Sequence, residues 1–169
     1  MRKTKEINRY ESEYYINGAV AQSDNYVVYG GCDGWFRIID CISGVQTDSM
    51  QVEAYIPASL AISGDWCYVA DYAENIYGIK LEKGKIVSSK KIIESQDKSR
   101  TFVSVPAVSD KMVYIVSDDR NIYTINSTGI ERSRNKDGST AWKYLLKGNV
   151  GESFPVVCKD KLLACTKPE

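Results

Sequence analysis

The side chains that most often carry out catalysis at neutral pH are absent from this chain or unsuitably spaced. Histidine does not occur among its 169 residues, which excludes Ser-His-Asp and Cys-His nucleophiles and every histidine-ligated metal. The cysteines are Cys32, Cys41, Cys67, Cys158 and Cys165. Because their number is odd and no Cys-x-x-Cys pair occurs, we interpret them as structural thiols. We therefore expect no catalytic residue, no metal and no cofactor.

Cys158 and Cys165 are close enough in the sequence to suggest a shared site. Lys159 and Asp160, however, predict a two-residue turn between two short strands. Such a turn places Lys161, and not Cys165, opposite Cys158. We therefore assign both thiols a structural role.

Charged residues that could bind a partner fall into an acidic group at three similar turns and a basic group at residues 130–136. The candidates for a partner-binding rim are Asp33, Asp71, Glu74, Asp118, Asp119, Arg132 and Arg134. The acidic side chains either form a ring that attracts a basic partner or a cation, or serve only the turns, to which Asp and Gly are suited. The basic segment is either a partner-docking loop or a solvated loop. The structural interpretation is the simpler one for both groups.

Composition excludes several classes of protein. Lys and Arg number 22 and Asp and Glu number 22, whereas a protein that neutralises nucleic-acid phosphates carries a basic excess. The 43% of hydrophobic residues excludes a disordered chain. No apolar run approaches a membrane span, and the start shows no apolar stretch of a signal peptide. As written the chain is expected to be cytoplasmic, unless it is cut from a longer, exported protein.

A strand–turn–strand unit occurs three times, and these units place the charged turns. The copies start at Tyr26, Trp66 and Met112, so they are 40 and 46 residues apart. A fourth copy begins at Phe154 and stops at Glu169, before its second strand. We divide the single domain, residues 1–169, into repeat units at about 17–56, 57–102, 103–149 and 150–169.

A period of about 40–50 residues that holds four short strands is typical of a β-propeller blade. One four-stranded sheet cannot bury both faces, so repeated positions are expected to pack between neighbouring blades. One such position holds Gly30, Ala70, Val116 and Cys165, and another holds Ile39, Ile79 and Ile125. A β-sandwich, the alternative, has no reason to repeat in register. The predicted fold is all-β, a partial β-propeller of about three and a half to four four-stranded blades.

The repeat resembles the PQQ-like, or quinoprotein, repeat. The third copy, Pro106 to Asn126, carries the resemblance best, with Ala-Val-x-Asp-x-x-Val-Tyr followed by Ile-Tyr-x-Ile-Asn. In this family a glycine turn and then a tryptophan that docks on the next blade usually follow. Gly138 and Trp142 fit that ending, whereas the first two copies have Asp48 and Ser88 at the tryptophan position.

The resemblance implies one of two kinds of protein. Quinoprotein dehydrogenases hold pyrroloquinoline quinone and calcium on the propeller axis, with the quinone between a tryptophan and a disulfide of adjacent cysteines. No two cysteines are adjacent here, and no calcium-binding acidic group could be matched. The other branch is non-catalytic and includes the lipoprotein subunit of the outer-membrane β-barrel assembly machinery, a protein-docking platform. The chain is more similar to this branch, so we expect a non-enzymatic scaffold with a protein partner; a fragment of a quinone-dependent dehydrogenase is the alternative.

A carbohydrate-binding propeller is a third class, and it would show exposed tryptophan and tyrosine in repeated pockets. The aromatic residues that repeat here lie within predicted strands: Tyr68, Tyr77, Tyr114 and Tyr123. Packing between blades explains that placement better than sugar binding.

Three copies and part of a fourth do not close the ring of seven or eight blades that the family implies. Three explanations of the incomplete ring remain open. The chain is a fragment of a longer protein, which is the explanation we prefer; or residues around Ile7–Tyr10 complete its last blade; or two chains close one ring as a homodimer about a two-fold axis. Tyr10, Tyr14 and Tyr15 are interpreted as the outer strand of a preceding blade and its connection, rather than as a groove-binding arm.

Overall fold

The computed structural model describes residues 12, 14–93, 102, 104–109, 112–118, 120–126, 143–148 and 154–166. Its strands are β1 (Ala21–Ser23), β2 (Tyr26–Gly30), β3 (Trp35–Asp40), β4 (Gln46–Gln51), β5 (Ala61–Ser63), β6 (Trp66–Ala70), β7 (Ile76–Glu82), β8 (Lys85–Ile93), β9 (Ala107–Val108), β10 (Met112–Val116), β11 (Asn121–Asn126), β12 (Lys143–Leu145), β13 (Val156–Cys158) and β14 (Lys161–Leu163). No helix among these residues is long and apolar enough to cross a membrane.

The described strands form antiparallel sheets in which strands that are consecutive in the chain lie side by side. We call these sheets blade 1 (β1–β4), blade 2 (β5–β8), blade 3 (β9–β12) and blade 4, of which β13 and β14 are described. The register repeats with the sequence: Val28 of β2 faces Ile38 of β3, and Tyr68 of β6 faces Gly78 of β7, 40 residues later. The repeated pattern in the sequence therefore corresponds to a repeated strand pairing.

The first two strands of a blade are joined by a two-residue turn. Its first residue has a positive φ at Asp24, Gly64 and Lys159, of 52°, 55° and 55°, which is the conformation that a tight hairpin turn needs. In blade 4 the pair that closes the turn is Cys158 and Lys161. The predicted turn, and the prediction that Lys161 lies opposite Cys158, are confirmed.

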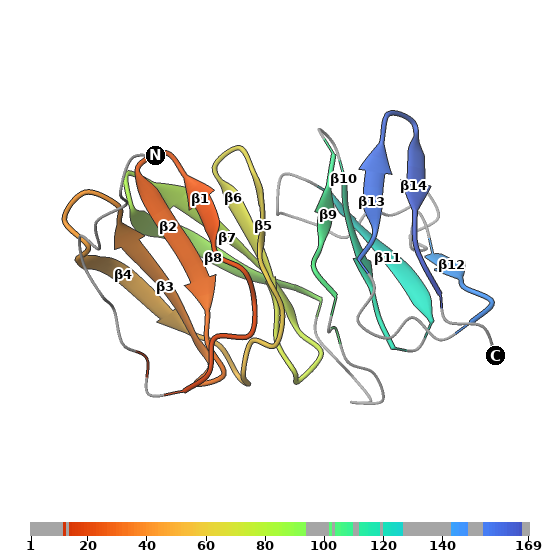
Figure 1. Ribbon diagram of the computed structural model, residues 1–169, viewed down its shortest axis with the longest axis horizontal. Coiled ribbons are helices and arrows are strands. Elements are labelled where there is room, and N and C mark those ends of the chain that lie inside the picture. Colours follow the sequence, from red (N-terminus) through yellow and green to blue (C-terminus); the bar gives the residue numbers. More distant parts are fainter. Residues whose placement is uncertain are drawn as a thin grey trace, which may run out of the picture.

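The blades stack face to face in chain order (Figure 1). The first strands β1, β5, β9 and β13 are neighbours in space, and the outer strands β4 and β8 also touch. Sheets that stack with their first strands together are arranged as in a propeller. The prediction of an all-β, propeller-like fold is confirmed.

Alternate residues of each strand face opposite neighbouring blades. Ile38 of β3 packs in one buried cluster with Tyr77 and Ile79 of β7, whereas Ile76 of β7 packs on the other side with Tyr123 of β11. This follows from the two-residue period of a strand, whose successive side chains point to opposite faces. Tyr77 and Tyr123 are buried, as their repeated position within strands predicts.

The position predicted to hold small residues does lie between blades. A Cβ added to Gly30 would lie 2.7 Å from the Cβ of Ile56, which is too close for two carbon atoms. Ala70 and Val116 are also buried at this position, whereas Cys165 is exposed. The difference arises because Cys165 lies on the face of blade 4 that no other described strand covers.

A polar contact joins the outer strands of blades 1 and 2. The Asp48 carboxylate accepts a hydrogen bond of 2.9 Å from the amide of Ile86, and the Thr47 hydroxyl donates one of 2.8 Å to the carbonyl of Gly84. Asp48 stands where the PQQ-like pattern has its docking tryptophan. A hydrogen bond to the next blade is therefore found where the family would place an aromatic contact.

Candidate functional site

The turns between the second and third strands lie at one end of the blades and have the same backbone geometry. We call these turns, residues 31–34, 71–74 and 117–120, the corners, and the end of the blades that bears them the corner rim. Each corner is closed by a 3.0 Å bond from the amide of its first residue to the carbonyl four positions later. The fourth corner residue has a positive φ in all three: 76° at Gly34, 67° at Glu74 and 63° at Arg120. The three corners therefore share one backbone conformation, although their side chains differ.

The corners are also tied to other strands by backbone bonds. The carbonyl of Gly34 accepts a 2.8 Å hydrogen bond from the amide of Val52, and the carbonyl of Arg120 accepts one of 2.8 Å from Leu146. Val52 and Leu146 lie just beyond the fourth strands of blades 1 and 3. Because both ends of the first and third corners are bonded, side chains there are held on a fixed frame.

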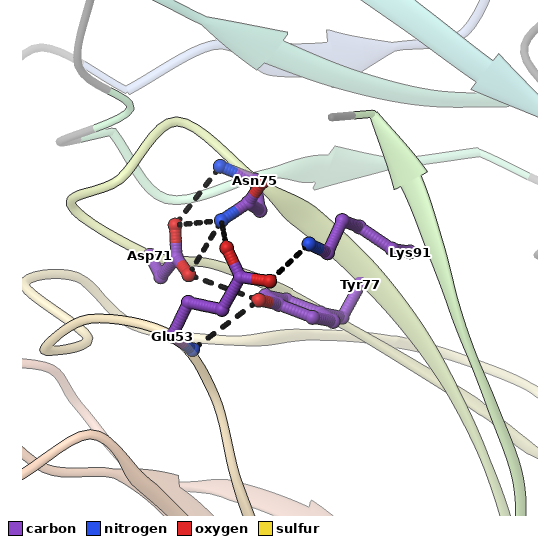
Figure 2. Close-up of polar contacts among 5 residues, drawn as sticks. All are labelled: Glu53, Asp71, Asn75, Tyr77 and Lys91. Carbon is purple, nitrogen blue, oxygen red and sulfur yellow. Dashed lines mark hydrogen bonds and ion pairs between the residues drawn. The ribbon is translucent and has the colours of Figure 1, made fainter. Parts of the chain in front are cut away.

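The second corner contains a buried network of polar side chains (Figure 2). The carboxylate of Asp71, which is 0% exposed, accepts hydrogen bonds from the amide of Asn75 at 2.9 Å, from its Nδ2 at 3.0 and 3.1 Å, and from the Tyr77 hydroxyl at 3.0 Å. A buried carboxylate is tolerated when its oxygens accept several such bonds. Asp71 therefore serves the fold of this corner.

Glu53, in the connection that follows blade 1, extends this network to the surface. Its carboxylate accepts a 3.2 Å bond from Asn75 Nδ2 and forms an ion pair with Lys91 of β8. Its amide donates a 3.3 Å bond to the Tyr77 hydroxyl. Burial, together with the nearby carboxylates of Asp71 and Glu53, raises the pKa of Tyr77. Tyr77 is therefore a neutral hydrogen-bond donor near neutral pH and does not act as an acid or base there.

In the first corner the bonded carboxylate belongs to Asp33, the third corner residue, whereas Asp71 is the first residue of its corner. Asp33 accepts a 3.1 Å bond from the amide of Trp35 and forms a doubly hydrogen-bonded ion pair with Arg37. The hydrogen bond from Arg37 holds the pKa of Asp33 below its ordinary value, against the effect of burial. Arg37 occupies the strand position that Tyr77 occupies in blade 2, so the two corners satisfy a carboxylate by different means.

The predicted acidic rim residues are not arranged alike. Asp71 and Glu74 are buried, Asp33 is partly buried in its ion pair, and Asp118 is exposed. Asp119, Arg132 and Arg134 lie outside the described residues. Among the described candidates, Asp33 and Asp71 are engaged in bonds of their own corners, as the turn interpretation predicts.

The corner rim carries a group of exposed aromatic residues that the sequence reasoning did not assign to it. The rings of Tyr55 and Tyr72 are stacked, with centroids 4.4 Å apart and planes at 20°, and the two residues are 39% and 43% exposed. The amide of Tyr72 donates a 2.9 Å bond to the carbonyl of Tyr55, and that of Cys32 does the same to Tyr15. Tyr15 and its neighbour Tyr14 are exposed. We call Tyr14, Tyr15, Tyr55 and Tyr72 the rim tyrosines.

A signal for this group was present in the sequence. Tyr15 and Tyr55 are 40 residues apart, which is the repeat offset, so both occupy the same place ahead of the first strand of a blade. Tyr72 lies in a corner and Tyr55 in a connection, and only the fold brings these two together. In the described part of the chain, no group of three or more Cys, Asp or Glu is placed to hold a metal ion.

Comparison with known proteins supports the fold. No protein-family model and no curated protein matches the chain, so the resemblance to PQQ-like repeats stays a prediction. BamB from Moraxella catarrhalis matches with a TM-score of 0.67 at 21% identity, over 92% of this chain and 45% of BamB. Two computationally designed proteins, Ika8 and Ika4, also match, each with a TM-score of 0.67 at 14% identity. The match to Ika8 covers 88% of this chain and 42% of Ika8. The match to Ika4 covers 93% of this chain and 88% of Ika4.

These similarities identify a β-propeller fold. The chain spans less than half the length of BamB and Ika8, but most of the length of Ika4. Identities this low say nothing about a shared activity. The function must therefore be argued from this chain's own surface.

Proposed function

We propose that this protein is a non-catalytic scaffold that binds a protein partner through the rim tyrosines. The observation that carries the proposal is the exposed Tyr55–Tyr72 stack on a corner of fixed geometry. Tyrosine offers a large contact area with few rotatable bonds, and it is enriched in protein interfaces. A rigid propeller that presents tyrosines in this way suits recognition better than chemistry.

The polar groups of the same rim support this choice. Asp71 is buried and fully engaged within its own corner, and Asp33 is neutralised by Arg37. Neither is available as a general acid, a general base or a metal ligand. The side chains that the described rim offers to a partner therefore include the rim tyrosines and the exposed carboxylate of Glu53, with Asp118 the exposed carboxylate among the predicted rim residues.

Site-specific crosslinking tests the proposal. A photo-crosslinking residue at Tyr72 is expected to capture one discrete protein, whereas the same residue at Ile42, which is exposed in the turn after β3 at the opposite rim, is not. The captured protein, once purified, should bind the unmodified chain, and Tyr55→Ala should weaken that binding about tenfold or more because a central aromatic contact is lost. Equal capture at both positions, or binding that Tyr55→Ala leaves unchanged at an unchanged unfolding midpoint, would overturn the proposal.

A further inference from the structure

Tyr55 and Tyr72 are joined at their backbones as well as at their rings. The amide of Tyr72 donates a 2.9 Å hydrogen bond to the carbonyl of Tyr55, and the ring centroids are 4.4 Å apart with their planes at 20°. The strands β5 and β6 lie between these two residues in the sequence. The fold therefore holds in contact two phenol rings that are far apart along the chain.

The hydroxyl groups of the two rings also meet. Burial raises the pKa of Tyr55, and the side-chain hydrogen bond to Tyr72 raises it further. Two stacked rings whose hydroxyls share a hydrogen bond run in the same direction, so the ring carbons beside each hydroxyl are brought together. These ortho carbons are the atoms at which two phenoxyl radicals form a carbon–carbon bond.

An oxidant in solution can reach both rings. Tyr55 and Tyr72 are exposed, whereas Tyr68, Tyr77 and Tyr123, in the strands, are buried. The ring contact of Tyr123 is with Phe102, which has no hydroxyl and forms no phenoxyl radical. Exposure and a second phenol therefore coincide at the Tyr55–Tyr72 stack.

The equivalent place beside the first corner has the same backbone contact without the second ring. Tyr15 and Cys32 lie 40 residues before Tyr55 and Tyr72, and the amide of Cys32 donates a 2.9 Å bond to the carbonyl of Tyr15. A thiol stands there in place of a phenol. The repeat therefore supplies the contact between connection and corner, and Tyr72 makes it a pair of oxidisable rings.

We propose that Tyr55 and Tyr72 form an oxidative modification site, at which hydrogen peroxide and a haem peroxidase join the two rings as a dityrosine. Each phenol gives up one electron and the proton of its hydroxyl, and the two radicals form one bond between their ortho carbons. The hydrogen on each of these carbons then moves to the oxygen and restores the phenol. One peroxide molecule takes up both electrons and both protons and becomes two water molecules. Coupling within the chain is favoured because the rings already touch.

The new bond would tie the connection after blade 1 to the corner of blade 2. It would close a loop that contains β5 and β6, which restricts the unfolded chain and so stabilises the fold. It would also change the surface that the rim tyrosines present. The reaction does not depend on the function proposed for these residues, because it requires the free protein and an oxidant alone.

Treatment of the dilute full chain with hydrogen peroxide and a haem peroxidase tests the proposal. We expect dityrosine fluorescence in a protein that stays monomeric on a denaturing gel, with a yield per chain that dilution does not change. Asp65 and Asp71 lie between the two tyrosines in the sequence, so cleavage before aspartate separates their peptides unless the new bond joins them. Mass spectrometry should find the two peptides joined and lighter by two hydrogen atoms. The joined protein should unfold at a higher urea concentration than the untreated one.

Two variants that each remove one hydroxyl provide matched controls. Tyr72→Phe keeps a stacked ring that forms no phenoxyl radical, so the fluorescence should fall to background. Tyr26→Phe, at a half-buried tyrosine that packs on Gly84 away from the corner rim, should leave the yield unchanged. An equal yield in Tyr72→Phe, separate peptides after cleavage, or a product formed between chains would overturn the proposal. Such a result would leave partner binding by the rim tyrosines standing, because crosslinking at Tyr72 tests that function separately.

Discussion

The interface between blades 1 and 2 and the one between blades 3 and 4 are built from the same repeat, but only the first is filled. Between blades 1 and 2, the third strand β7 supplies Tyr77, Ile79 and Leu81 to a buried cluster, and about 130 Å³ stays empty. Between blades 3 and 4, the described residues leave about 630 Å³ empty. The difference shows that the first two strands of a blade do not bury the face of the preceding blade by themselves, and that the third strand completes the contact.

The largest effect that this comparison predicts is a contrast between two truncations in the core. Ile79→Ala should lower the free energy of unfolding by about 2–5 kcal/mol, because the side chain is fully buried and leaves a cavity. Leu162→Ala, at the equivalent interface with blade 3, should cost about 1 kcal/mol or less, because its side chain already borders an open groove. Urea denaturation of both variants measures the difference. Equal losses would show that the groove is closed in solution.

The stacking of blades could be predicted from the sequence because it depends on local patterns. Repeated strand–turn–strand units locate the corners, and Lys159-Asp160 predicts its turn from two residues alone. Whether a corner carboxylate is exposed could not be predicted, because that depends on side chains of other strands. Asp71 accepts hydrogen bonds from Asn75 and Tyr77 of its own blade, and Glu53 from the preceding connection bonds to those same two residues.

The rim tyrosines could be predicted only in part, for a similar reason. Tyr15 and Tyr55 share a repeat position, which the spacing shows. The stack of Tyr55 on Tyr72 forms because the connection after β4 passes beside the next corner, with a 2.9 Å backbone bond between them. A pairing between a connection and a corner is a property of stacked blades, not of either segment.

The second prediction concerns the corner network that joins blade 2 to the connection from blade 1. Asp71→Ala should lower the free energy of unfolding by about 1–3 kcal/mol, because the buried Tyr77 hydroxyl and Asn75 amide lose their acceptor. Asp71→Asn is the matched control. It keeps one acceptor oxygen, so it should lower the free energy of unfolding by less than Asp71→Ala does. Denaturation midpoints measure both. A loss for Asp71→Asn as large as for Asp71→Ala would mean that the negative charge, and not the hydrogen bonds, matters here.

The third prediction uses the first corner, on the face of blade 1 that points away from blade 2. Asp33→Asn should lower the free energy of unfolding at pH 7 by about 1–2 kcal/mol, because its charge-assisted bonds to Arg37 become neutral. Arg37 lowers the pKa of Asp33 in the folded state, so its stabilisation is present above the unfolded value of 3.8 and is lost as pH falls through the lower, folded value. The difference between wild type and Asp33→Asn should therefore shrink toward zero as the pH falls below 3.8 and through the lower, folded value. A difference that stays constant from neutral to acid pH would contradict this pairing.

The smallest effect is expected at the surface end of the interface between blades 1 and 2, where Glu53 pairs with Lys91. Glu53→Gln should change the free energy of unfolding by no more than about 1 kcal/mol, because the carboxylate is 59% exposed and water and salt screen the ion pair. The amide of Gln keeps an oxygen for the hydrogen bond from Asn75, so the change isolates the charge. Lys91→Gln is the matched change on the other partner, and raising the salt concentration should remove the difference of both variants from wild type. A loss of several kcal/mol that persists in high salt would show that Glu53 belongs to the buried network of Asp71 rather than to its exposed edge, and that the filled interface is held by polar bonds as much as by the third strand.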